Sequence, residues 1–236
     1  MNEHTPVFAN PLVGLGYEDA TLLSPGALSA VCARPGVGKT AFLVQMALWA
    51  ISHDKNVLHV SLGDPIKKVD LWYHDFFANL SRRSAIQDAS AAWMTFFPRR
   101  FIMTFKVEGF SVPKLKERMA DLVEQKIFIP HVILIDGLES DIYLSKIIED
   151  LKNLARKFSI PVWISVQTQQ YPQTEDASRV PAPLHEIAGV FESIVSIEGS
   201  IEQIHVRSVK GGSGKASRPS LRLDPSTLLL ALDDPH

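Results

Sequence analysis

The sequence has one cysteine, almost no net charge and no long apolar run, and each scarcity excludes a class of protein. Cys32 is the single cysteine among 236 residues, which excludes an intramolecular disulfide and is typical of a reducing compartment such as the cytoplasm. The formal net charge of −2 provides no global attraction to nucleic acid or to a membrane surface. The apolar runs are far shorter than the roughly 20 residues that a membrane-spanning helix needs, so we expect no membrane partner.

The composition that remains fits one globular domain with a substantial core. Hydrophobic residues make up 46% of the chain and charged residues 21%, and the length suits a single domain with small additions. We expect residues 1–24 to form a lead-in segment and residues 25–236 to form the domain. The first residues are polar and broken by prolines, which is not the pattern of a signal peptide.

Strand-like and helix-like stretches alternate after residue 25. The pattern predicts strands at 27–33, 56–62, 100–105, 131–136 and 161–166, and helices at 39–52, 66–82, 112–125 and 142–158. Beyond about residue 192 it changes to short strands separated by turn-rich pieces. We therefore expect an α/β fold with a mainly parallel sheet between helices and an antiparallel edge at its C-terminal end, which is RecA-like in outline.

The stretch CARPGVGKTAF, residues 32–42, is close to the phosphate-binding P-loop (Walker A) formula G-x-x-x-x-G-K-S/T, with Ala33 in place of the first glycine. The glycines of such a loop let backbone amides surround phosphates, Lys39 would reach the terminal phosphates, and Thr40 would bind Mg²⁺. A helix that begins at about Lys39 adds partial positive charge. The alternative is a chance glycine turn. The residues expected to bind the nucleotide are Arg34, Pro35, Gly36, Val37, Gly38, Lys39, Thr40 and Ala41.

A magnesium–nucleotide site also needs a carboxylate at the end of a nearby strand. Asp136 follows the apolar stretch HVILI, so we expect it to bind the metal together with Thr40. The alternative is an aspartate that caps the turn before Gly137. The predicted cofactors are therefore ATP and Mg²⁺.

A second glycine-rich piece, GGSGKA at residues 211–216, is only superficially similar to the first. It has Ala216 where a hydroxyl residue is needed, and no apolar helix follows it. We interpret it as a hairpin loop, with a phosphate contact from Lys210 or Lys215 as the alternative.

These motifs together resemble a known family. ARPGVGKTAF is similar to the loop of DnaB-type replicative helicases, which also commonly begins with alanine followed by Arg-Pro. VLHVSLGDP, VILIDGL and LKNLARKFSIPVWISVQ resemble the second strand, the magnesium strand, and the helix, strand and terminal glutamine of that family, and PSLRLDPSTLLL resembles its closing strands. The likeness covers about residues 25–232. KaiC-type and RadA-type ATPases share much of this outline.

The resemblance implies roles for residues outside the loop. Gln167 would sense the γ-phosphate, with a polar residue that merely ends a strand as the alternative. Family members form rings with the nucleotide between subunits, so the resemblance implies a homo-oligomer, a ring or a dimer. A basic finger from the neighbouring subunit then stabilises charge in the transition state, and Arg207 or Lys210 is the nearest match.

The sequence departs from the family where the family has a catalytic glutamate. Gly63 occupies that position and Asp64 follows it, one methylene shorter. Asp64 would face the other side of a continued strand, although a turn at Gly63 would bring it back. Glu139 is a weaker substitute. Loss of a water-positioning group costs about 10²–10⁴-fold in rate, so we expect slow or absent hydrolysis.

The loops that face DNA in the family are acidic here. The stretch between Asp136 and the next helix holds Glu139 and Asp141 and no lysine or arginine, and the loop after Gln167 holds one arginine and two acids. Neither resembles a surface that neutralises phosphates, so DNA binding has weak support. Lys210 is also a weaker finger than an arginine. We expect a DnaB-like ATPase of low rate; the alternative is an ATP-dependent switch or assembly factor that binds a protein partner, and a small-molecule kinase is a weaker third.

Overall fold

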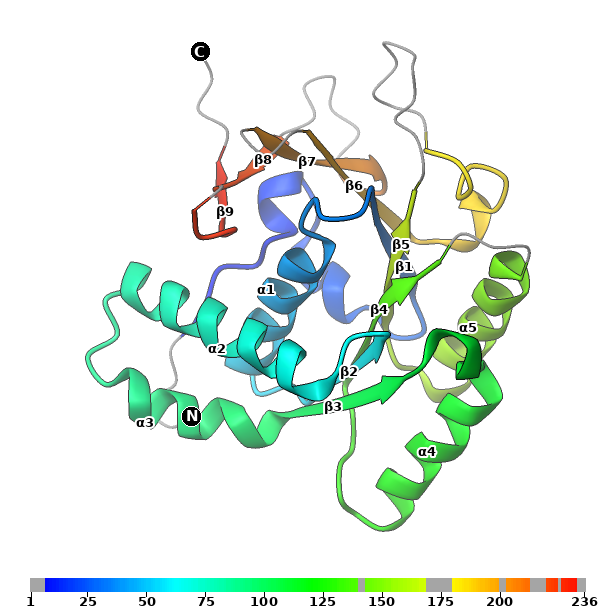
Figure 1. Cartoon of the computed structure of the whole chain (residues 1–236), viewed down its shortest axis with the longest axis horizontal. Helices are drawn as coiled ribbons and strands as arrows, with labels where there is room; N and C mark the ends of the chain where they lie inside the picture. The colour runs from blue at the N-terminus through cyan, green and yellow to red at the C-terminus, as the bar shows by residue number, and fades with distance from the viewer. Residues whose placement is uncertain are drawn as a thin grey trace.

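Strands rich in β-branched and apolar residues pair into a single sheet at the centre of the chain (Figure 1). This computed structural model describes residues 7–139, 143–168, 180–199, 203–212, 220–224 and 226–232. Within them the strand order is β3-β2-β4-β5-β1-β6-β7-β8-β9. The strands are β1 Leu28–Ala33, β2 Val57–Leu62, β3 Arg100–Phe105, β4 Val132–Leu138, β5 Val162–Gln167, β6 Ser193–Gly199, β7 Ile204–Lys210, β8 Ser220–Leu223 and β9 Leu230–Leu232.

The sheet has two parts that differ in strand direction. From β3 to β6 every neighbouring pair is parallel, and from β6 to β9 every pair is antiparallel. The predicted parallel sheet with an antiparallel C-terminal edge is therefore confirmed. Because parallel strands end at one edge, the residues that follow β1, β2, β4 and β5 come together there, which is where ligands bind in open α/β sheets.

Helices cover both faces of the sheet. One face is covered by α1 and α2 with the short α3, and the other by α4 and α5, drawn in green in Figure 1. Among the described residues, no helix combines the length and the apolar character needed to cross a membrane. The helices are α1 Lys39–Ser52, α2 Ile66–Arg83, α3 Ala89–Phe96, α4 Val112–Glu124 and α5 Leu144–Phe158.

The described part of the lead-in segment, residues 7–24, packs on the same face as α1. Its apolar side chains, Phe8, Leu12, Leu15 and Leu22, are buried in the core of that face. The hydroxyl of Tyr17 donates to the carbonyl oxygen of Lys210 at 2.7 Å, which ties the segment to the antiparallel edge. The division of the chain at residue 24 stays a prediction.

Candidate nucleotide-binding site

The loop between β1 and α1 curls because two of its glycines adopt left-handed backbone conformations. Gly36 has φ 75° and Gly38 has φ 103°, values that side chains disfavour. A Cβ atom on Gly36 would meet no heavy atom within 4 Å, so the loop is open on that side. A Cβ atom on Gly38 would lie 2.7 Å from Leu223 Cδ1 of β8, so the closing strands press against the loop. Ala33 is buried as the last residue of β1, where its methyl group does not obstruct the loop.

Lys39 turns its ammonium back over this curl. Its Nζ donates to the carbonyl oxygens of Ala33 at 3.0 Å and of Arg34 at 2.8 Å. Burial lowers the pKa of Lys39 from its usual value, and the negative charge of Asp136 opposes that shift. A cation held in a partly buried loop is stabilised by a nearby anion, so the geometry suits an ammonium that exchanges carbonyl contacts for phosphate oxygens.

Thr40 and Asp136 meet across 96 residues of sequence. The hydroxyl of Thr40, in the first turn of α1, donates to Asp136 Oδ2 at 2.6 Å. The other carboxyl oxygen of Asp136 accepts from Ser165 Oγ of β5 at 2.5 Å, and Ser165 Oγ in turn accepts from the Gly137 amide at 2.8 Å. Asp136 is therefore fixed from both sides at the edge of the sheet. We did not predict Ser165 from the sequence, although a serine within an apolar strand was a visible signal.

The donor chemistry of this pair fits Mg²⁺. Hydroxyl and carboxylate oxygens are ligands that Mg²⁺ prefers, and the ion usually combines one or two of them with water and substrate phosphates. The loop beside the pair presents backbone amides, a lysine and open space at Gly36. The residues present therefore fit a magnesium nucleotide with its phosphates in the curl.

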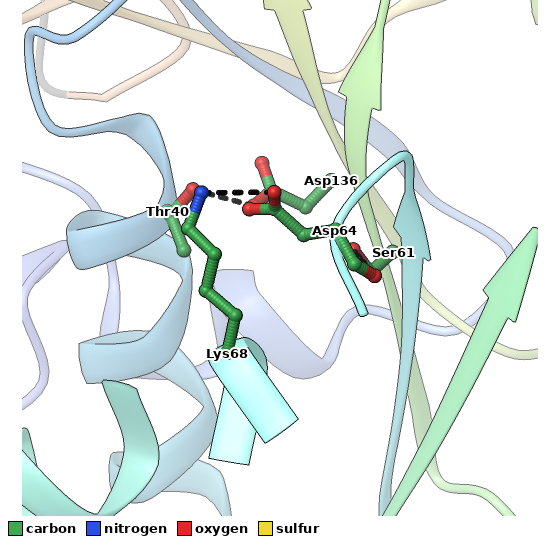
Figure 2. A network of polar contacts seen from close by, with 5 residues as sticks. All are labelled: Thr40, Ser61, Asp64, Lys68 and Asp136. Carbon is green, nitrogen blue, oxygen red and sulfur yellow. Dashed lines mark hydrogen bonds and ion pairs between the residues drawn. The ribbon is translucent and has the colours of Figure 1, made fainter. Parts of the chain in front are cut away.

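The chain turns sharply where β2 ends. Gly63 has φ 96°, and its amide donates to the carbonyl oxygen of Phe105 on β3 at 3.0 Å, so pairing continues to this residue before the turn. The hydroxyl of Ser61 donates to the carbonyl oxygen of Asp64 at 3.1 Å and closes the turn. Ser61 pairs with Asp136 in the sheet. Asp64 is thus brought round to the face of the sheet on which Asp136 lies, as Figure 2 shows.

A lysine outside the sequence motifs completes this corner. Lys68 Nζ lies 2.9 Å from Asp64 Oδ1. In Figure 2 the Lys68 ammonium and the Thr40 hydroxyl both point toward the carboxyl groups of Asp64 and Asp136. The spacing of four residues between Asp64 and Lys68 was visible in the sequence, but the turn that aims both side chains at the loop was not.

Two further predicted residues lie near the loop. Gln167 ends β5 directly beside Ala33, and its side chain is exposed. Glu139 follows β4 and is also exposed. Arg34 and the remaining loop residues connect β1 to α1, with a guanidinium nitrogen of Arg34 donating to the carbonyl oxygen of Gly199 at 3.2 Å.

The two candidate finger residues lie on β7. Lys210 pairs with Ile194, near the start of β6, and its ammonium donates to the carbonyl oxygens of Ala188 and Phe191 at 2.7 and 2.6 Å. It therefore lies away from Thr40 within one chain. Arg207 pairs with Ser196, and its guanidinium lies 3.8 Å from Glu198. A role for either residue toward a neighbouring subunit stays a prediction.

Some predicted features fall outside the described residues. Gly211 and Gly212 follow β7, but the rest of the second glycine-rich piece, with Lys215 and Ala216, lies outside them, as does Asp141. So do residues 169–179 of the loop after Gln167.

Comparison with known proteins bears on the fold. No protein-family model matches the chain, and no curated protein matches it. Among the solved structures that resemble it is the ATPase domain of a DnaB-like helicase, with a TM-score of 0.60, 19% sequence identity, and coverage of 88% of this chain and 85% of that one. At this identity the likeness speaks for the fold and not for the activity. This chain therefore has the RecA-like α/β fold of that ATPase domain.

Proposed function

We propose that this protein is an ATP-binding, DnaB-like P-loop ATPase, related to helicases, that hydrolyses ATP slowly. The observation that carries the proposal is the 2.6 Å contact between the Thr40 hydroxyl and the Asp136 carboxylate, beside a lysine-bearing glycine loop. A nucleotide loop and a metal carboxylate that converge in this way are the parts that phosphoryl-transfer sites share. The ATPase description of the similar solved structure supports the same interpretation.

Each residue of the site then has a chemical task. The loop amides and Lys39 would bind the phosphates, and Thr40 and Asp136 would hold Mg²⁺, which neutralises charge on the phosphate oxygens when bound. Ser165 would keep the Asp136 carboxylate in the orientation that Thr40 requires. Gln167, beside the loop, would respond to the presence of the terminal phosphate.

Slow hydrolysis follows from the corner at Gly63. Asp64 is the nearest carboxylate that could orient water, and it is engaged in an ion pair with Lys68. A paired carboxylate is a poor acceptor for a proton and a poor anchor for water, because its lone pairs already serve the ammonium. We expect turnover well below that of an enzyme with a free glutamate at this place.

The same ion pair favours a second candidate, a non-motor ATP-dependent switch or assembly factor that binds a protein partner. Such a protein needs tight binding and little turnover, and the acidic Glu139 beside the site is poorly suited to nucleic acid. Homo-oligomerisation and a cytoplasmic location belong to both candidates as proposals. DNA belongs to the first alone.

ATP hydrolysis measured with and without single-stranded DNA separates the two candidates. Stimulation by DNA supports the helicase-related ATPase, whereas tight ATP binding without turnover supports the switch. Lys39→Ala is the control for turnover by contaminants, and failure of the wild type to bind ATP would overturn both candidates.

A carboxyl variant tests the cause of the slow rate. Asp64→Glu restores the missing methylene in a residue that already faces the site, so we expect it to raise turnover. Gly63→Glu would place the carboxyl at the family position, but φ 96° at Gly63 strains any side chain there. Asp64→Asn should lower turnover, and unchanged rates in both Asp64 variants would exclude a role for this carboxylate.

A further inference from the structure

Lys68 is placed at the nucleotide end of α2 rather than on its outer surface. It lies in the first turn of a helix whose amino-terminal residue is Ile66, and its Nζ reaches back 2.9 Å to Asp64 Oδ1. The two side chains retain 55% and 36% of their exposure. Figure 2 shows the ammonium pointing into the space that the Thr40 hydroxyl and the Asp136 carboxylate also face.

Helix stability does not account for this placement. The first turn of α2 contains no acidic residue and carries Lys67 and Lys68, although cations are unfavourable near the positive end of a helix. An exposed ion pair at this spacing contributes only about 0.3–0.5 kcal/mol. A lysine at this position is therefore better explained by an anion that it meets beyond the helix.

The metal pair identifies where such an anion would lie. Asp136 is fixed by Thr40 at 2.6 Å and by Ser165 at 2.5 Å, so its position at the sheet edge is set before any ligand arrives. Asp64 belongs to the turn after β2, the strand that pairs with β4 beside Asp136. The Lys68 ammonium is thus next to the site on the side away from the carbonyl contacts that Lys39 makes in the loop.

We propose that Lys68 is a cation, supplied by the same chain, that recognises the terminal phosphate of ATP. This inference rests on the proposed nucleotide site. Without a terminal phosphate, Lys68 pairs with Asp64. With ATP, the ammonium moves to a γ-phosphate oxygen, which carries more negative charge than a carboxylate, and Asp64 is released toward the site. The four-carbon stem of lysine allows this exchange without movement of α2.

This arrangement would make the chain distinguish ATP from ADP on its own. The loop residues and Lys39 contact phosphates that both nucleotides have, whereas Lys68 contacts one that only ATP has. Lys210, the finger candidate, is engaged with two carbonyl oxygens of its own chain. Lys68 therefore supplies the sensing charge before any neighbouring subunit is present.

Calorimetric titration of the full chain with MgATP and MgADP tests the proposal. Lys68→Ala should weaken MgATP binding about 10- to 100-fold, the loss of one charge-assisted hydrogen bond, while MgADP binding changes less than about threefold. Lys67→Ala is the matched control, because Lys67 is an exposed lysine of the same turn, and it should alter neither affinity. Lys68→Arg keeps the charge and should retain most of the preference for ATP.

A second variant tests the resting partner. Asp64→Asn removes the group that competes with phosphate for Lys68, so it should tighten MgATP binding by up to about fivefold and leave MgADP binding unchanged. Equal weakening of both nucleotides by Lys68→Ala, or no weakening, would overturn the role of Lys68 while the nucleotide site stands. A wild type that binds neither nucleotide would overturn the site and the role of Lys68 with it.

Discussion

At the scale of single residues, Ser165 links the strand that ends at the metal carboxylate to the strand beside it. Its hydroxyl donates to Asp136 at 2.5 Å and accepts from the Gly137 amide at 2.8 Å. Ser165→Ala would leave both groups without this partner in a buried place. We expect it to lower the free energy of unfolding by about 1–3 kcal/mol, measured by urea denaturation, and to weaken magnesium-dependent ATP binding.

Ser29→Ala is the matched control for that variant. Ser29 is also a buried serine of the parallel sheet, but its hydroxyl has no hydrogen-bond partner within the described part of the chain. We expect the substitution to change the free energy of unfolding by less than about 0.5 kcal/mol. Equal losses at Ser29 and Ser165 would contradict the role given to the Ser165 hydroxyl.

Cys32 offers a chemical test of burial beneath the loop. Its thiol is fully buried in β1, and burial raises its pKa to about 12. Because only the thiolate reacts, a disulfide reagent at pH 8 should leave the folded protein unmodified and titrate one thiol after unfolding in guanidinium chloride. Rapid modification of the native protein would show that β1 opens next to the loop.

The residues at the site differ in how far the sequence predicts them. Lys39, Thr40 and Asp136 stand in local motifs whose spacing indicates a phosphate loop and a strand end. Ser165 and Lys68 belong to no such motif. Their contacts depend on the register of β5 against β4 and on the turn at Gly63, which are properties of the folded sheet.

At the scale of secondary-structure elements, a buried histidine joins β2 to α2. His59 Nδ1 lies 3.0 Å from the Tyr73 hydroxyl, and burial lowers the pKa of His59, with Asp136 opposing and Arg100 adding to the shift. The unfolded chain therefore binds a proton below about pH 6.5 that the folded chain does not, so acid removes stability. We expect the free energy of unfolding to fall between pH 7 and pH 5.

His59→Phe should flatten this pH dependence, which denaturation at several pH values would measure. The contribution of one such group is at most about 1.4 kcal/mol for each pH unit below 6.5. His74→Gln is the control, because His74 is exposed on α2 and should leave the slope unchanged. An unchanged slope in His59→Phe would mean that His59 is not held neutral in the fold.

The position of α2 also depends on a buried arginine at the start of β3. Arg100 pairs with Asp70, and its guanidinium carbon lies 4.9–5.0 Å from the centres of the Tyr73, Trp93 and Phe97 rings. Arg100→Ala removes these contacts, and we expect it to lower the free energy of unfolding by about 2–3 kcal/mol in urea denaturation.

The neighbouring arginine provides the comparison. Arg99 is more exposed and pairs with Asp54 at 2.8 Å on the surface, so Arg99→Ala should cost less than about 1 kcal/mol. A similar cost for both variants would contradict the role assigned to the aromatic cage around Arg100.

The elements themselves follow from the sequence to different degrees. The predicted helix 39–52 coincides with α1, because a glycine loop and a histidine-bounded apolar stretch mark its ends. Helix α3 was not predicted from the sequence. Its eight residues are too few for a clear period, and its Trp93 and Phe96 pack against Phe77 of α2, a stabilisation that the local sequence does not reveal.

At the scale of the whole molecule, the strand order decides which predicted residues meet. It brings the loop after β1 and Asp136 of β4 to one edge of the sheet, and it leaves the Lys210 ammonium near residues that precede β6. Alternating strands and helices predicted the parallel sheet, but not this order, because the pairing of β1 with β5 and β6 joins segments far apart in the chain.

Assembly is the property of the whole molecule that the resemblance implies. If Arg207 or Lys210 serves a neighbouring subunit, nucleotide should promote self-association. We expect sedimentation velocity to show an oligomer with MgATP and a smaller species without nucleotide. A monomer at every protein concentration with MgATP would contradict the proposed homo-oligomer and would leave ATP sensing to the single chain.

The central claim is that a magnesium nucleotide lies between the loop at residues 34–41 and the carboxylate of Asp136. A crystal structure with Mg²⁺ and a non-hydrolysable ATP analogue tests it most directly. We predict the phosphates inside the curl at Gly36 and Gly38, with the metal beside the Thr40 hydroxyl and the Asp136 carboxylate. A nucleotide bound elsewhere, or no uptake by crystals whose loop is accessible, would contradict the account.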